Sequence, residues 1–151
     1  MSTPAPSTRP RQTAAMQRWG IQAAVALYRL TGGAIGGRVG PERVLLLTTT
    51  GRKSGQRRTI PVSYFEDGST LFVIASNAGR DYHPAWYLNL SALPDAEIQI
   101  RREHRHVRAR EASPEERIRL LAYASSQNPR RDEAGPTTRA IPVVILQPVS
   151  A

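Results

Sequence analysis

Short apolar runs, separated by polar or glycine-containing turns, dominate this chain and predict a mainly antiparallel fold. Strands are predicted at 43–50 (RVLLLTTT), 59–65, 70–76, 97–102, 105–110 and 140–146 (AIPVVIL). The first two flank a polar turn at 51–56, and Asp67 and Gly68 make a tight turn before the third. Three antiparallel strands therefore follow one another as a meander.

Three further segments have the spacing of helices. Residues 13–30 form an amphipathic helix that Gly32 and Gly33 end, and residues 83–92 form a short one. Ser113 begins a third helix, with an N-cap serine, a proline at the first helical position and a glutamate at the capping-box position. The side chains predicted to face the core are Met16, Trp19, Ala23, Ala24, Leu27 and Leu30, then Trp86 and Leu90, then Ile118, Leu121 and Ala122.

These elements predict an α+β, mainly β fold: a small barrel of about six mostly antiparallel strands flanked by about three helices. The 151 residues fit one domain at 13–151, preceded by a disordered tail at 1–12. No apolar run approaches the ~20 residues of a membrane span, and no secretory segment is visible, so a cytoplasmic protein is expected. The first helix is expected to pack on the core. Peripheral membrane contact or a role as a substrate lid is the alternative, which the aromatic side chain of Trp19 keeps open.

Composition removes several kinds of chemistry. The chain has no cysteine, which excludes disulfides, thiolate nucleophiles and cysteine-ligated metals, and its three histidines do not suggest a metal site. Its net charge of +9 attracts anions, whether nucleic acid, a membrane surface or an anionic coenzyme. A nucleic-acid module is disfavoured, because the arginine-rich stretch 101–110 contains no aromatic residue for base stacking.

The segment 48–59 (TTTGRKSGQRRT) carries most of the candidate chemistry. It places four cationic side chains, two glycines and several hydroxyls between two strands. Glycines let backbone N–H groups converge on an anion, while arginine and lysine add charge. It is not a Walker A loop, because Gln56 follows the second glycine. A phosphate site and a solvated basic hairpin tip are both compatible with this composition.

Three runs carry a resemblance to a known family. LLLTTTGRKSGQRRTIPVSYFEDG, VIASNAGRDYHPAWYLNL and TTRAIPVVIL resemble the deazaflavin-dependent nitroreductases and quinone reductases, which use reduced coenzyme F420. The resemblance extends over most of residues 27–148. It implies a split β-barrel oxidoreductase that transfers a hydride from the reduced deazaflavin to a small organic acceptor, of the quinone or nitroaromatic class. A non-catalytic deazaflavin carrier and an FMN-binding split-barrel oxidoreductase are the alternatives.

The resemblance also implies a set of coenzyme-binding residues. Arg52, Lys53 and Arg58 would hold the phosphate, and Ser54 and Gln56 would shape the loop. The remaining positions are Thr59 and Pro61 against the ring, the backbone of Ser76, Asn77, Ala78 and Gly79, and Trp86 and Asn89 on the short helix. Mechanism would be mostly the coenzyme's own, with a proton from solvent or from Ser63, Tyr64 or Ser76.

The chain departs from this family before its last strand. Many relatives carry a cluster of tyrosines there that covers the acceptor pocket, whereas residues 125–136 (SSQNPRRDEAGP) are polar. Ser63 also lies where some relatives have a tyrosine. The departure predicts a more open and more polar acceptor pocket.

Overall fold

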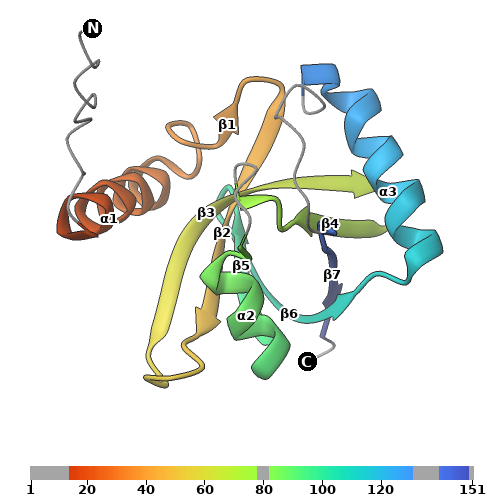
Figure 1. Ribbon diagram of the computed structural model, residues 1–151. Helices are drawn as coiled ribbons and strands as arrows, with labels where there is room; N and C mark the ends of the chain where they lie inside the picture. Colours follow the sequence, from red (N-terminus) through yellow and green to blue (C-terminus); the bar gives the residue numbers. More distant parts are fainter. Residues whose placement is uncertain (1–13, 78–81, 131–139, 150–151) are drawn as a thin grey trace, which may run out of the picture.

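The computed structural model describes residues 14–77, 82–130 and 140–149 (Figure 1). The expected N-terminal tail and much of the polar stretch 125–136 lie outside these residues. The elements are α1 (Ala14–Thr31), β1 (Arg38–Val39), β2 (Glu42–Thr50), β3 (Arg57–Asp67), β4 (Thr70–Ile74), α2 (Ala85–Ala92), β5 (Asp95–Ile100), β6 (Glu103–Glu111), α3 (Pro114–Gln127) and β7 (Val143–Pro148).

Six of these strands close into an antiparallel barrel. The strand order is β1-β2-β3-β4-β7-β6-β5, and β5 pairs again with β2, which joins the two ends of the sheet. The two-residue β1 only extends the edge at β2. The predicted fold class, a mainly β barrel with three helices, is therefore confirmed.

Several predicted strand ends are displaced. The strand predicted at 97–102 ends earlier, because Arg101 has a φ of 56° and makes the turn from β5 to β6. The strand predicted at 140–146 begins only after Pro142, which has no N–H to add to a ladder. The strand predicted at 59–65 is longer, since β3 remains paired with β2 as far as Arg57. Pairing with β2 thus extends β3, whereas local backbone features at Arg101 and Pro142 set the other two limits.

Alternate residues of the strands fill the interior of the barrel. The most deeply buried are Leu45, Leu47, Val73, Ile98, Val107 and Leu146. On the outside, α1 packs against Val44 and Leu46 of β2. Helix α3 packs beside Phe65 and Phe72, and Figure 1 shows it on the opposite side of the barrel from α1. The two helices therefore cover opposite sides of the barrel.

The face of α1 that packs on the barrel is not the predicted one. Val25 and Tyr28 are buried, whereas Trp19 and Leu30 are 75% and 79% exposed. Of the other residues predicted to face inward, Ala23 and Leu27 are exposed, Ala24 is partly buried, and the side chain of Met16 lies outside the described part. At 100° per residue the helix carries two apolar stripes on opposite sides. Periodicity alone could not choose between them.

Tyr28 explains why the stripe that contains Val25 and Tyr28 faces the barrel. Its hydroxyl donates to the backbone carbonyls of Val44 and Gln99, at 3.0 and 3.3 Å, and accepts from the backbone N–H of Arg101 at 3.0 Å. A tyrosine that satisfies backbone groups on two strands fixes which side of a helix faces the sheet.

Helix α3 begins as predicted but turns a different face inward. The Ser113 hydroxyl accepts from the Glu116 N–H, and the Glu116 carboxylate accepts from the Ser113 N–H, which confirms the capping box. The buried residues are Leu120 and Ala124, while Ile118, predicted to be inward, is 68% exposed. Ala122 is also exposed and Leu121 is half-buried.

Candidate functional site

The turn between β2 and β3 is tightly folded by its two glycines. The N–H of Gly51 donates to the Gln56 carbonyl at 2.7 Å, and the N–H of Gly55 donates to the Gly51 carbonyl at 2.8 Å. Gly55 has a φ of 69°, and a Cβ on Gly51 would lie 2.7 Å from the Ser54 hydroxyl oxygen. That hydroxyl accepts from the N–H of Gln56 at 3.2 Å. Ser54 and Gln56 thus define the shape of this turn.

The buried side-chain amide of Asn89, on α2, holds the turn in place through hydrogen bonds. Oδ1 of Asn89 accepts from the backbone N–H and from Nη1 of Arg52, at 3.2 and 3.1 Å, and its Nδ2 donates to the Thr49 hydroxyl at 3.3 Å. Asn89 is only 4% exposed. Its hydrogen bonds position the loop, and its short helix is anchored in turn by Trp86, which is buried in the barrel core.

Positive charge at this turn is not neutralised by carboxylates. Arg52, Lys53 and Arg58 are exposed, and none of them has an ion-pair partner in the described part of the chain. Other arginines are paired: Arg57 with Glu97 at 2.9 Å, Arg105 with Glu103 at 3.0 Å and Arg110 with Glu116 at 2.8 Å. Three cations without a carboxylate partner therefore lie together at the turn for which the resemblance implies a phosphate.

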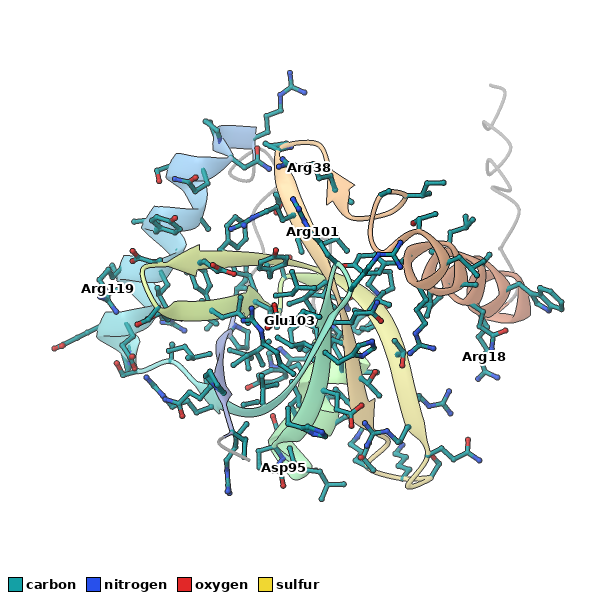
Figure 2. All side chains as sticks on the ribbon, turned by 180° about the vertical axis from the view of Figure 1, so that it is seen from behind. Arg18, Arg38, Asp95, Arg101, Glu103 and Arg119 are labelled. Atoms are coloured by element: carbon teal, nitrogen blue, oxygen red, sulfur yellow. The ribbon has the colours of Figure 1, made fainter. Side chains whose placement is uncertain are left out.

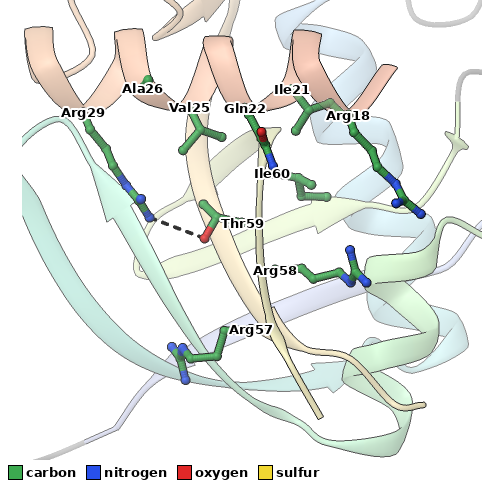
Figure 3. A pocket seen from close by; sticks show the side chains of 10 residues that line it. All are labelled: Arg18, Ile21, Gln22, Val25, Ala26, Arg29, Arg57, Arg58, Thr59 and Ile60. Atoms are coloured by element: carbon green, nitrogen blue, oxygen red, sulfur yellow. Dashed lines mark hydrogen bonds between the residues drawn. The ribbon is translucent and has the colours of Figure 1, made fainter. Parts of the chain in front are cut away.

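A cavity of about 400 Å³ adjoins this turn between α1 and β3 (Figure 3). Its apolar wall comes from Ile21, Val25, Ala26 and Ile60, and its polar lining from Arg18, Gln22, Arg29, Arg57, Arg58 and Thr59. Arg58 and Thr59 thus connect the cationic turn to a partly apolar space. A substrate-lid role for the first helix was only an alternative expectation, and Arg18 and Arg29 were not among the predicted site residues, although they lie eleven residues apart and therefore on one helical face.

The remaining predicted residues fall into different places. Pro61 follows Thr59 on the same face of β3, by the alternation of a strand. Ser76 and Asn77 follow the end of β4, and Asn77 Nδ2 donates to the Tyr82 carbonyl at 3.0 Å. Ala78 and Gly79 lie outside the described residues. Trp86 is 8% exposed and does not line the cavity beside Arg58.

The candidate proton donors are not equivalent. Tyr64 is buried, with the Arg43 guanidinium 5.0 Å from its ring centroid, and it does not line the cavity between α1 and β3. Burial raises the pKa of Tyr64 above its ordinary value, while the charge of Arg43 opposes that shift. Ser63 shares the outward face of β3 with Thr59, and Ser76 is half-buried.

Two absences apply to the described part of the chain. It contains no cluster of three or more histidine, cysteine, aspartate or glutamate side chains that could hold a metal ion. Within the same residues, no helix is long and apolar enough to cross a membrane.

The closed barrel, the glycine turn and the unpaired cations define the class as a small β-barrel protein with an exposed cationic turn beside a cavity. The sequence matches the family described as F420H(2)-dependent quinone reductase over residues 20–148, and the chain belongs to that family. The predicted family, coenzyme and reductase class are thereby confirmed.

Comparisons with individual relatives support this family assignment. The chain is 37% identical to the F420H(2)-dependent quinone reductase Rv1261c of Mycobacterium tuberculosis over 126 residues, 80% of this chain and 85% of that protein. A solved F420-H2 dependent reductase, FDR-A, is 35% identical, with a TM-score of 0.62 over 69% of this chain and 93% of its own. A structure described as a domain-swapped dimer is 30% identical, with a TM-score of 0.64 over 87% of this chain and 98% of its own.

Proposed function

We propose that this chain passes a hydride from reduced F420 to a quinone-type acceptor, and that the β2–β3 turn holds the coenzyme phosphate. The observation that carries the proposal is the set of uncompensated cations, Arg52, Lys53 and Arg58, on a glycine turn beside a partly apolar cavity. The side chains suit an anion, because two arginine forks and a lysine all donate. The N–H groups of Gly51, Arg52, Gly55 and Gln56 already donate within the protein, so the side chains rather than these N–H groups would hold the phosphate.

The other residues have supporting roles in this proposal. Thr59 and Pro61 would lie against the ring, and the backbone at 76–79 would line the coenzyme. Asn89 would act by holding Arg52 and its loop, and Trp86 by holding the helix that bears Asn89. The coenzyme supplies the hydride when bound. The acceptor gains this hydride and one proton, so that a quinone becomes a hydroquinone. Among the candidate proton donors, Ser63 lies on the same face of β3 as Thr59.

Titration of the purified protein with reduced F420 and with FMN, followed by menadione or a nitroaromatic, tests the function. We expect F420 to bind in preference and to be reoxidised only after an acceptor is added. Binding without acceptor-dependent oxidation would support a carrier, and preferential FMN binding would reassign the coenzyme.

The double variant Lys53→Ala/Arg58→Ala tests the phosphate site. Each charge-assisted hydrogen bond contributes about 1.5–3 kcal/mol, so affinity for F420 should fall about a hundredfold or more while the fold is kept. Arg108→Ala/Arg119→Ala removes the same charge from exposed positions elsewhere and should change affinity only a few-fold. Equal effects of the two double variants would refute the phosphate assignment.

We further propose that the outer stripe of α1 contacts an anionic membrane surface from the cytoplasmic side. Trp19 and Leu30 stand out from this face, and Ile35 and Val39 just beyond the helix are also exposed. Exposed apolar side chains on a chain of net charge +9 fit a lipid surface that is both apolar and anionic.

Sedimentation with vesicles tests this contact. The protein should bind phosphatidylglycerol vesicles and bind phosphatidylcholine vesicles much less. Trp19→Ser/Leu30→Ser should abolish binding, whereas Ile118→Ser, which alters an equally exposed residue on α3, should not. Self-association on gel filtration that is lost in the same double variant, without vesicle binding, would indicate a second copy instead.

A further inference from the structure

The cavity between α1 and β3 has two cationic ends. Arg18 and Arg29 lie eleven residues apart on α1, which corresponds to about 16 Å along the helix axis. Figure 3 shows Arg18 above Arg58 at one end, while Arg29 points to Thr59 at the other. The phosphate proposed above would occupy the end near Arg58, and the coenzyme ring would lie against Thr59. An acceptor placed over that ring for hydride transfer would therefore have Arg29 beside it.

Arg29 is the uncompensated cation at its end. Its Nη2 donates to the Thr59 hydroxyl at 3.4 Å, a long and neutral contact, and it has no carboxylate partner in the described part of the chain. Its neighbour Arg57 is held by Glu97 at 2.9 Å, so its charge is already balanced. The Thr59 hydroxyl lies 2.7 Å from that of Thr48. This contact helps to fix the group that orients Arg29.

Val25 and Ala26 of α1 lie next to Arg29 and make the cavity wall there apolar (Figure 3). A flat hydrocarbon ring fits such a wall, and an anionic substituent on that ring would complement Arg29. An arginine pairs with a planar or tetrahedral oxyanion through two N–H groups, which gives direction as well as charge.

We propose that Arg29 makes this cavity selective for acceptors that carry an anionic group, such as sulfonated or carboxylated quinones. This inference rests on the proposed reductase function and adds the class of acceptor. Thr59 orients Arg29 from β3, so that the acceptor ring would lie between α1 and the coenzyme ring, with its oxyanion toward the C-terminal half of α1.

Steady-state kinetics with two acceptors tests the selectivity. We compare kcat/KM for 1,4-naphthoquinone-2-sulfonate with that for neutral menadione, in the wild type and in Arg29→Gln. The ratio of the two values should fall about tenfold or more in Arg29→Gln, and Arg29→Lys should retain part of it. Comparing the ratio between variants cancels the difference in reduction potential between the two quinones.

Arg119→Gln is the matched control. It removes one positive charge from α3, on the far side of the molecule from α1 (Figure 2), and should leave the ratio unchanged. A fall of the same size in Arg119→Gln would mean that net charge, rather than Arg29, sets the selectivity.

A binding measurement separates this inference from the reductase function. Calorimetry measures the affinity of the free protein for naphthalene-2-sulfonate and for the neutral naphthalene-2-sulfonamide, which need neither coenzyme nor turnover. The sulfonate should bind more tightly, and Arg29→Gln should remove the preference. Equal affinities in the wild type would overturn the inference even if F420 binds and menadione is reduced. If F420 binding fell in Arg29→Gln while the acceptor ratio stayed constant, Arg29 would belong to the coenzyme site.

Discussion

Asn89→Ala would separate a coenzyme ligand from a residue that positions a loop. The Asn89 amide makes three hydrogen bonds, two to Arg52 and one to Thr49, and it is almost completely buried. At about 0.5–1.5 kcal/mol net for each bond, their loss should lower the free energy of unfolding by about 2–4 kcal/mol. For a domain of this size, that corresponds to a fall in Tm on the order of 10 °C.

Urea unfolding of the free protein measures this loss without any coenzyme. Arg52→Ala is the matched variant, since it removes the Nη1 contact but keeps the backbone N–H bond to Asn89. Its cost should be about 1 kcal/mol or less. The double variant should cost less than the sum of the two single variants, because both remove the same contact.

The two roles of Asn89 predict different combinations of results. If it positions the loop, stability and F420 affinity fall together in Asn89→Ala. A variant that is as stable as the wild type but binds F420 poorly would refute the positioning role and would make the amide a direct ligand.

Other predictions follow from the same hydrogen bonds and charges. Tyr28→Phe removes a hydroxyl that serves backbone groups of β2 and β5, so it should cost about 1–3 kcal/mol in urea unfolding and loosen α1; an unchanged midpoint would argue against that anchor. The Arg110 guanidinium lowers the pKa of Glu116 from 4.5 to about 2, so the ionised carboxylate stabilises the fold above pH 4.5, and this contribution is lost as the pH falls toward 2. Thermal melts should therefore show Glu116→Gln below the wild type at neutral pH, with the gap closing on acidification; a constant gap would contradict the pairing.

Local signals in the sequence predicted some features correctly. The serine, proline and glutamate at 113–116 identified the start of α3, and the glycines after residue 31 identified the end of α1. The composition of the 48–59 segment located the cationic turn. These signals work because capping, positive φ and charge density depend on residues close together in the chain.

Which face of a helix packs on the barrel depends on residues that lie far apart in the chain, and the inward faces predicted for α1 and α3 were wrong. Periodicity gave α1 two apolar stripes, and the side that faces the barrel was decided by Tyr28 bonding to strands that lie far along the sequence. The same limit hid the cavity, since Arg29 and Thr59 meet only when α1 packs across β3.

The amino-acid sequence by itself determined the family, the mainly β class and the cationic glycine turn, because each rests on motifs or on neighbouring residues. The tertiary structure alone decided which cations stay unpaired, since Arg57, Arg105 and Arg110 find carboxylates and Arg29, Lys53 and Arg58 find none in the described part of the chain. The number of charged side chains follows from the composition. Whether a given charge is paired depends on its distance from an opposite charge, and for residues far apart in the sequence only the folded structure sets that distance.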